Sequence, residues 1–309
     1  MAQERRLLKP KHDAKLPSLE KRKLPAERIS VSAEERNMLN HRLIEAVDGG
    51  KLQDAKRLLR AGADADARVD VGKSVWWLHN DNGKTALMMA ARHGHTGICA
   101  LLIGNGAEVN AQENASGGKT ALMEAACGRH IGTCRFLIEK GADVNARDDE
   151  GTTLLMRVAN WVEGSKVCRF LVDNGADVKA KNKLGDNALI FALMAGNADA
   201  AKLLIRKGAD VNAKSRGGFE GDWTALIFAA NGGHAGVCRL LIERGADILA
   251  KDGRGKTALW YAHYGSGSNA RDAKTKELLD REYLKLFLGK GRAAAFYPAF
   301  KACTSPFSL

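Results

Sequence analysis

Residues 83–111, GKTALMMAARHGHTGICALLIGNGAEVNA, contain in one stretch the pattern that decides the fold. Thr85 is suited to cap free N–H groups, and the run after it, residues 86–91, favours a helix. A Gly-His pair interrupts this run, and apolar residues then recur at helical spacing over residues 98–103. Gly106 follows, at a point where ending the helix requires a left-handed backbone that glycine adopts without strain. The segment therefore predicts two short helices separated by a turn and followed by an extended loop.

The same pattern repeats along the chain. Gly-Ala-Asp or Gly-Ala-Glu recurs at intervals of 44, 35, 34, 33 and 37 residues, starting at Gly62, Gly106, Gly141, Gly175, Gly208 and Gly245. Thr-Ala-Leu or a near variant starts at Thr85, Thr120, Thr153, Asn187, Thr224 and Thr257. Helices this short are unstable alone in water, so each unit must bury its apolar face against its neighbours. We therefore expect a mainly α solenoid of stacked helix–turn–helix units joined by hairpin-like loops, in place of the two domains that 309 residues suggest.

The repeating string Gly-Lys-Thr-Ala-Leu-Met…Gly-His…Leu-Leu-Ile…Gly-Ala-Asp-Val-Asn-Ala resembles the ankyrin repeat. The resemblance covers residues 37–288 and implies about seven repeats, including both caps. The family usually opens its first helix with Thr-Pro-Leu-His, but here the proline is missing and the histidine is replaced by Met88, Met123, Met156, Ile190, Ile227 and Trp260. Residues 1–36 are polar and basic and are expected to be disordered. Residues 289–309 form a tail that either packs on the last repeat or binds a partner.

Charge and composition narrow the classes of function. The formal net charge is +12, and part of it lies at the ends, because residues 1–36 hold ten basic and six acidic side chains. No run of roughly 18 apolar residues occurs and no signal-peptide core stands near the start, so we expect no membrane insertion. We expect a cytoplasmic protein, with the nucleus as the alternative. The six cysteines lack the close pairing of a disulfide framework.

The apparent motifs for catalysis and metal binding are incomplete or recur only because the repeat recurs. Gly-Lys-Thr occurs three times, but the upstream glycine of a phosphate-binding loop is replaced by Leu78, Glu113 and Ala250. One register of the second helix holds Cys99, Cys134, Cys168 and Cys238. Stacked helices lie about 8–10 Å apart, too far for sulfurs to share a zinc ion at bonds of about 2.3 Å, so we expect small buried residues there. A structural role in the turn is expected for His95, His130 and His234. We therefore expect no enzyme, no cofactor and no metal.

Three loops are longer than the repeat requires, and all three lie in the hairpin. The extra lengths are 11, 2 and 4 residues, after Gly62, Gly106 and Gly208. Insertions of this kind map to one face of a solenoid, which is often the binding face. Trp76 and Trp77 lie in the longest loop, and either they contact a partner or they fold back on the protein itself.

In ankyrin proteins, partners bind the hairpin tips and the exposed side of the first helices, which form a concave groove. Carried over position by position, the resemblance and the inserted loops give these candidate partner-binding residues: Trp76, Trp77, Lys84, Arg92, His93, Lys119, Trp161, Phe219, Trp223, Asn231 and Tyr264. This surface is expected to be basic at its N-terminal end and aromatic from Trp161 onward. It suits a protein partner with acidic and apolar parts.

The sequence thus predicts a non-catalytic scaffold or adaptor that is monomeric and binds no small-molecule substrate. Two alternatives stay open. The repeats could target substrates for a multi-chain enzyme such as a ubiquitin ligase, or the basic termini could associate weakly with nucleic acid.

Overall fold

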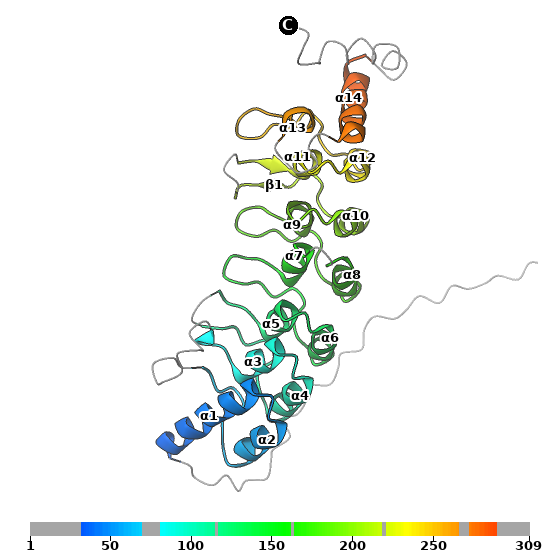
Figure 1. The fold of residues 1–309 in the computed structure, drawn as a ribbon. Helices are drawn as coiled ribbons and strands as arrows, with labels where there is room; N and C mark the ends of the chain where they lie inside the picture. Colours follow the sequence, from blue (N-terminus) through cyan, green and yellow to red (C-terminus); the bar gives the residue numbers. More distant parts are fainter. Residues whose placement is uncertain are drawn as a thin grey trace, which may run out of the picture.

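The computed structural model describes residues 32–69, 81–114, 117–161, 164–217, 221–265 and 272–288. Within them the helices form two rows that run along an elongated stack (Figure 1). The inner row consists of α1 (Ala33–Asp48), α3 (Ala86–Arg92), α5 (Ala121–Cys127), α7 (Leu154–Ala159), α9 (Ala188–Met194), α11 (Ala225–Asn231) and α13 (Ala258–Tyr264). The outer row consists of α2 (Leu52–Arg60), α4 (Thr96–Gly104), α6 (Ile131–Glu139), α8 (Ser165–Asp173), α10 (Ala198–Arg206), α12 (Ala235–Glu243) and α14 (Ala273–Leu288). The predicted solenoid is confirmed.

Each inner helix after α1 begins at the residue that the repeat pattern predicts. A side-chain oxygen accepts a hydrogen bond from the backbone N–H three residues on at Thr85, Thr120, Thr153, Asn187, Thr224 and Thr257. At the first of these caps the Thr85 N–H also lies 3.4 Å from the Met88 sulfur, so the methionine that replaces the family's histidine supplies a weak acceptor. The outer helices end as expected, because the Gly-Ala-Asp glycines have positive φ, for example 95° at Gly106.

The core lies between the two rows and is built largely from alanine and leucine. In α3 the six residues from Ala86 to Ala91 are all 0 % exposed. Small side chains here let the inner helices stack closely, and larger apolar side chains fill the space toward the outer helices. The four cysteines in the outer-helix register are buried, as predicted, whereas Cys127 at the end of α5 is exposed. Burial raises the pKa of the Cys99, Cys134, Cys168 and Cys238 thiols to about 12.

The histidines between inner and outer helices pack on glycines of the preceding repeat. A Cβ on Gly94 would lie 2.5 Å from Nδ1 of His130, and one on Gly50 would lie 2.8 Å from Cε1 of His95. Both glycines also have positive φ, of 71° and 67°. Burial and the charge of Lys202 lower the pKa of His234, the third histidine of this register. His95 and His130 are therefore packing elements that require a glycine in the repeat before them, whereas a Cβ on Gly196 would lie 3.8 Å from Nε2 of His234, an ordinary contact distance.

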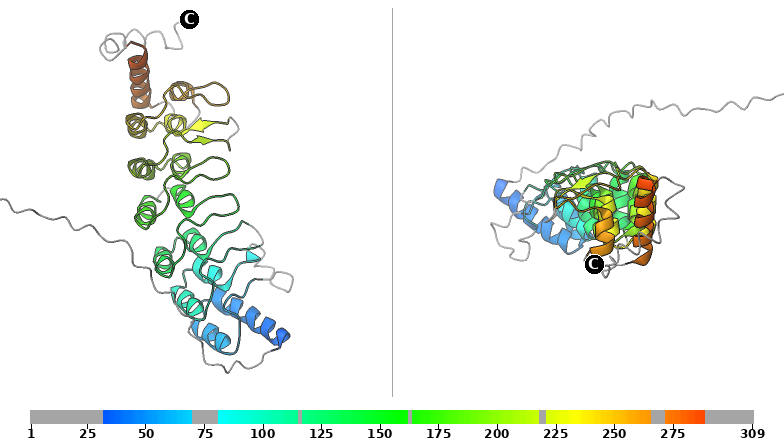
Figure 2. Two further views of the ribbon diagram at one scale, coloured as in Figure 1. Left: turned by 180° about the vertical axis from the view of Figure 1, so that it is seen from behind. Right: turned by 90° about the horizontal axis from the view of Figure 1, so that it is seen from above.

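The ends of the stack differ in detail from the prediction. α1 begins at Ala33, four residues before the predicted boundary at residue 37, because Ser32 and Glu35 form a capping box. At the other end α14 continues the outer row beyond α12 (Figure 2). No helix in the described ranges is long and apolar enough to cross a membrane. The predicted disorder of the N-terminal segment before residue 32 and the role of the tail 289–309 concern residues outside the described ranges.

Candidate protein-interaction surface

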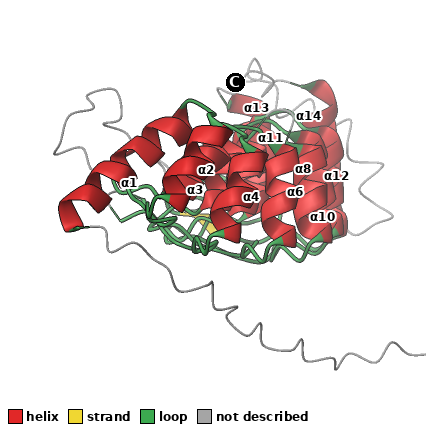
Figure 3. Ribbon diagram, turned by 90° about the horizontal axis from the view of Figure 1, so that it is seen from below, coloured by secondary structure: helices red, strands yellow, loops and turns green. Residues whose placement is uncertain are grey.

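Hairpin-like loops connect each outer helix to the next inner helix, and their described parts project on the side away from the outer row (Figure 1). Seen along the stack, the loops gather along one edge of the helices (Figure 3). Most are closed at the base by a backbone bridge to the residue that caps the next inner helix, in the pairs Arg68 with Thr85, Gln112 with Thr120, Arg147 with Thr153 and Lys251 with Thr257. The fifth hairpin has a short antiparallel pair, β1 (Lys214–Ser215) and β2 (Trp223–Thr224). We call the hairpins and the C-terminal ends of the inner helices the inner-helix surface.

Side chains at the hairpin bases form a ladder between neighbouring repeats. The Arg68 guanidinium donates to the carbonyl of Gly83 at 2.8 Å and to that of Gln112 at 3.0 Å. The Gln112 amide in turn donates to the carbonyl of Arg147 at 2.7 Å, and Arg147 donates to that of Lys181 at 2.8 Å. Each rung therefore fixes one hairpin against the next through a main-chain acceptor.

A second ladder lies nearer the outer helices and is interrupted once. Asn110, Asn145 and Asn212 each accept from the N–H of the aspartate in the next Gly-Ala-Asp and donate to its glycine carbonyl. Lys179 stands at the equivalent place in the fourth repeat, where it cannot form this pair of hydrogen bonds to the next Gly-Ala-Asp. The Lys181 ammonium lies 2.9 Å from the Asp210 carboxylate at the same junction. The hydrogen bond from Lys181 is the main cause that lowers the pKa of Asp210.

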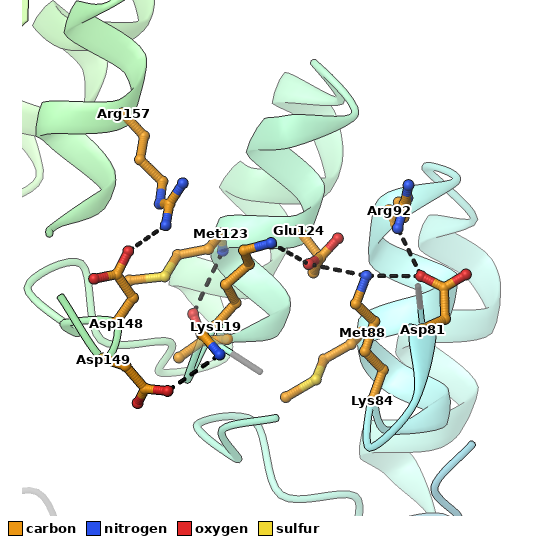
Figure 4. A network of polar contacts seen from close by, with 12 residues as sticks. Asp81, Lys84, Met88, Arg92, Lys119, Met123, Glu124, Asp148, Asp149 and Arg157 are labelled. Carbon is orange, nitrogen blue, oxygen red and sulfur yellow. Dashed lines mark hydrogen bonds and ion pairs between the residues drawn. The ribbon is translucent and has the colours of Figure 1, made fainter. Parts of the chain in front are cut away.

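The first two hairpins enclose a buried ionic network (Figure 4). The Lys84 ammonium lies 2.7 Å from Asp81 and 3.2 Å from Glu124, and both the Lys84 and Glu124 side chains are 3 % exposed. The expectation that Lys84 faces a partner is therefore wrong. Its side chain turns inward because Glu124, on the next repeat's inner helix, supplies a buried counter-charge.

The other candidates predicted at the N-terminal end, two cations and a histidine, also have acidic partners within the chain. Arg92 lies 2.6 Å from Asp81, His93 lies 3.1 Å from Asp48, and Lys119 lies 3.9 Å from Glu124. These side chains remain partly exposed, so they stay on the surface. Asp81 and Glu124 offset the positive charges of Arg92 and Lys119, and the prediction of a basic N-terminal end is therefore corrected. Arg157 is likewise paired with Asp148 on the third hairpin.

Trp223 is packed against its own protein. Its ring centroid lies 4.8 Å from that of Phe228 and 4.6 Å from that of Tyr261, and Trp260 lies 5.0 Å from Tyr261. The Lys256 ammonium is 3.4 Å from the Trp260 ring centroid, in cation–π geometry. Trp223 is half-buried, so it presents one part of its ring to solvent and uses the rest to join the fifth hairpin to α11 and α13.

The remaining candidates lie at the ends of inner helices. Trp161 is half-buried beneath the Arg129 guanidinium, 5.7 Å from its ring centroid. Asn231 is half-buried at the end of α11. Tyr264 at the end of α13 is 55 % exposed. Trp76, Trp77 and Phe219, together with the outer parts of all three longer hairpins, lie outside the described residues.

The structure adds residues that were not among the candidates. Met194 at the end of α9 is 57 % exposed and Leu184 on the fourth hairpin is 44 % exposed. Lys214 and Lys251 are exposed at hairpin bases. Both lysines occupy one fixed register, six residues after the Gly-Ala-Asp glycine, so the repeat alignment alone would have found them. Within the described ranges no group of three or more His, Cys, Asp or Glu side chains converges as a metal site would require.

Comparison with known protein families gives two matches. A model described as ankyrin repeats (3 copies) matches residues 43–148 and 146–215. A model described as ankyrin repeats (many copies) matches residues 218–262. No curated protein sequence matches the chain.

Proposed function

The chain belongs to the ankyrin-repeat family, whose repeats are generally protein–protein interaction modules, and we propose that it is a non-catalytic scaffold or adaptor that holds a partner protein on its inner-helix surface. The family is typically non-catalytic. The partner we propose has an apolar part and an acidic part, and the scaffold itself acts as a cytoplasmic monomer.

Exposed apolar side chains on the inner-helix surface carry this proposal. Met194 and Tyr264 are each more than half exposed at the ends of α9 and α13, and Leu184 lies exposed on the hairpin that leads into α9. Exposed apolar side chains gathered on one face favour a binding role. The aromatic rings around Trp223 and Trp260 lie beside Tyr264, since the Trp260 and Tyr264 centroids are 5.6 Å apart.

The rigidity of the surface supports the same function. The first ladder links the first four hairpins, and the second ladder links most of the repeats, including the fifth and sixth. The inner helices from α3 to α11 each pack between two neighbouring inner helices. A preorganised surface loses little conformational entropy when a partner binds. The scaffold therefore presents its contact side chains at fixed spacing.

The experiment compares partner capture by matched variants of the full chain. Partners cross-linked to the wild-type protein are identified by quantitative mass spectrometry and then purified for direct binding measurements. We expect Met194→Glu combined with Tyr264→Ala to weaken binding of a purified partner by about 10-fold or more. Met38→Glu is the control, because Met38 is 64 % exposed on α1, away from this part of the stack.

The control variant is expected to bind as the wild type does, and circular dichroism checks that all variants are folded. The proposal fails if the Met194 and Tyr264 double variant retains every partner with wild-type affinity.

A further inference from the structure

The residues six positions after each Gly-Ala-Asp glycine change their role along the stack. In the first three hairpins Arg68, Gln112 and Arg147 donate to main-chain carbonyls of the next repeat. In the fourth, Lys181 is paired with Asp210. The ladder ends there, and the side chains of the last two hairpins are left for other interactions.

The last two residues of this register are Lys214 and Lys251. Both are exposed, and neither forms an ion pair or a side-chain hydrogen bond with any residue that the structure describes. The same holds for Lys183 on the fourth hairpin and Arg216 directly after β1. We call Lys183, Lys214, Arg216 and Lys251 the basic ridge.

Two cations of the basic ridge, Lys214 and Arg216, point away from the strand face that carries Ser215 and Trp223. Ser215 is buried and pairs in register with Trp223, whereas its neighbours Lys214 and Arg216 are exposed. Side chains alternate between the two faces of a strand, so these two cations point to the face opposite Ser215. The ridge thus spans three successive hairpins with its charges directed toward solvent.

The charge of the inner-helix surface changes along the stack. At the N-terminal end the Lys84, Arg92 and Lys119 cations lie beside Asp81 and Glu124. The third hairpin exposes Asp149 and Glu150. Positive charge without a described counter-charge therefore accumulates on the fourth, fifth and sixth hairpins. A partner that supplies carboxylates gains most there.

We propose that the basic ridge binds an extended acidic segment of a protein partner in which a carboxylate recurs at every third residue. This inference rests on the proposed function and assigns the acidic part of the partner to the C-terminal half of the stack. Packed helices lie about 8–10 Å apart, and successive hairpins share that spacing. A polyproline II segment advances about 9 Å in three residues and returns the side chain to the same face, so one carboxylate meets each hairpin.

The neighbouring apolar side chains favour a protein segment over a nucleic acid strand. Leu184 follows Lys183 directly, and Met194 is exposed on the helix that this hairpin precedes. Aliphatic side chains give a polynucleotide backbone neither charge nor hydrogen bonds. A peptide with an apolar residue beside its carboxylates can contact both the basic ridge and the exposed apolar side chains of Leu184 and Met194.

The test uses a fluorescein-labelled peptide of twelve residues, with glutamate at every third position, alanine and proline between, and one leucine. Fluorescence polarisation measures its binding to the full chain. We expect Lys214→Glu with Lys251→Glu to weaken binding by about 10-fold or more, because attraction becomes repulsion at two hairpins. The control pair is Arg206→Glu with Arg239→Glu, which makes the same charge change at exposed positions of α10 and α12, the outer helices that lead into these two hairpins. The control is expected to change binding by less than about 3-fold.

Two further probes sharpen the result. A peptide of the same composition with its glutamates contiguous should bind more weakly than the spaced peptide, and a version with glutamine for glutamate should not bind. The inference is overturned if the spaced peptide does not bind, if the glutamine peptide binds equally, or if both variant pairs lose binding alike. It is also overturned if a labelled oligouridylate binds the ridge more tightly than the spaced peptide.

This experiment separates the inference from the proposed function. One outcome is that Lys214→Glu with Lys251→Glu leaves binding of a captured partner unchanged while Met194→Glu with Tyr264→Ala abolishes it. That outcome would support the scaffold function and contradict the acidic docking site. If neither variant changes capture, both proposals fail together.

Discussion

The Lys84 ammonium and the Glu124 carboxylate lie 3.2 Å apart across the junction of two repeats, each on a side chain that is 3 % exposed. Removing one member of a buried pair leaves a desolvated charge behind. Lys84→Met should lower the free energy of unfolding by about 3 kcal/mol, because Glu124 then keeps, among the described residues, only Lys119 at 3.9 Å as a counter-charge.

The double variant Lys84→Met with Glu124→Met should lose less than the sum of the two single changes, by about 1 kcal/mol or more. Urea denaturation of the four proteins measures this coupling. Lys207→Met serves as the control, since Lys207 pairs with Asp173 on the exposed surface and its loss should cost under about 1 kcal/mol. Strict additivity of the two buried changes would contradict the prediction.

Gly94 and Gly104 should respond in opposite ways to alanine. Gly94 has φ of 71°, and an added Cβ would meet the His130 ring at 2.5 Å. Gly94→Ala should therefore lower the free energy of unfolding by about 2 kcal/mol, the cost of a left-handed non-glycine residue with displacement of the ring. Gly104 is the last residue of α4 with nothing within 4 Å of an added Cβ, so Gly104→Ala should be neutral or stabilising by up to about 1 kcal/mol. Thermal denaturation compares the two, and equal shifts in Tm would refute the argument.

Cys127 should be the thiol that reacts first in the folded protein. It is exposed, whereas burial raises the pKa of Cys99, Cys134 and Cys168 to about 12 and keeps their sulfurs away from reagents. In a Cys303→Ser background, which removes the cysteine of the tail, a maleimide should label one site, and Cys127→Ser should abolish that labelling. Intact-mass spectrometry counts the adducts. Rapid labelling of Cys99 without unfolding would show that the core opens.

Tyr261→Phe should destabilise the last repeats in a pH-dependent way. The Tyr261 hydroxyl donates to Asp252 at 2.6 Å. Burial alone would raise the pKa of Asp252, but the hydrogen bonds from Tyr261 and from the Lys256 and Arg254 amides outweigh it and lower the pKa below its usual 3.8. At pH 7 the Tyr261→Phe change should lower the free energy of unfolding by about 1–2 kcal/mol.

A carboxyl with a lowered folded-state pKa contributes its full stability above its ordinary pKa of 3.8 and loses it as the pH falls through the folded value. The difference in the free energy of unfolding between wild type and Tyr261→Phe should therefore stay constant from about pH 7 to 5 and become smaller below about pH 4. Urea denaturation at several pH values measures it. The control is Tyr264→Phe, at an exposed ring, and a gap that widened in acid would contradict the assignment.

The repeat pattern predicted where helices begin and end because those positions depend on local chemistry. The Thr85 cap and the left-handed Gly106 need only residues within the same turn. The ionic contacts could not be predicted this way. Glu124 meets Lys84 across 40 positions of the sequence, and the contact depends on how the repeats stack. The charge of a surface residue is therefore not a guide to its availability until its neighbours are known.

Trp223 shows the same limit for apolar contacts. Its place in a lengthened hairpin favoured a partner contact, but the rings of Phe228 and Tyr261 lie within reach on the next two inner helices. Conversely, Lys214 and Lys251 were visible in the repeat register but were not distinguished from Arg147. Only the bonds that Arg147 makes to two carbonyls separate a structural cation from an available one.

The ladder at the hairpin bases also bears on how such a protein changes over evolutionary time. Arg68 bonds to Gly83 and Gln112 bonds to Gly118, so each side chain ties the two arms of its own hairpin below the lengthened segment. All the acceptors are main-chain carbonyls, which every amino acid possesses. Mutations and insertions in the outer part of a hairpin therefore leave these hydrogen bonds at its base intact. The hairpin tips can therefore acquire new sequences for binding different partners while the helical stack beneath them stays the same.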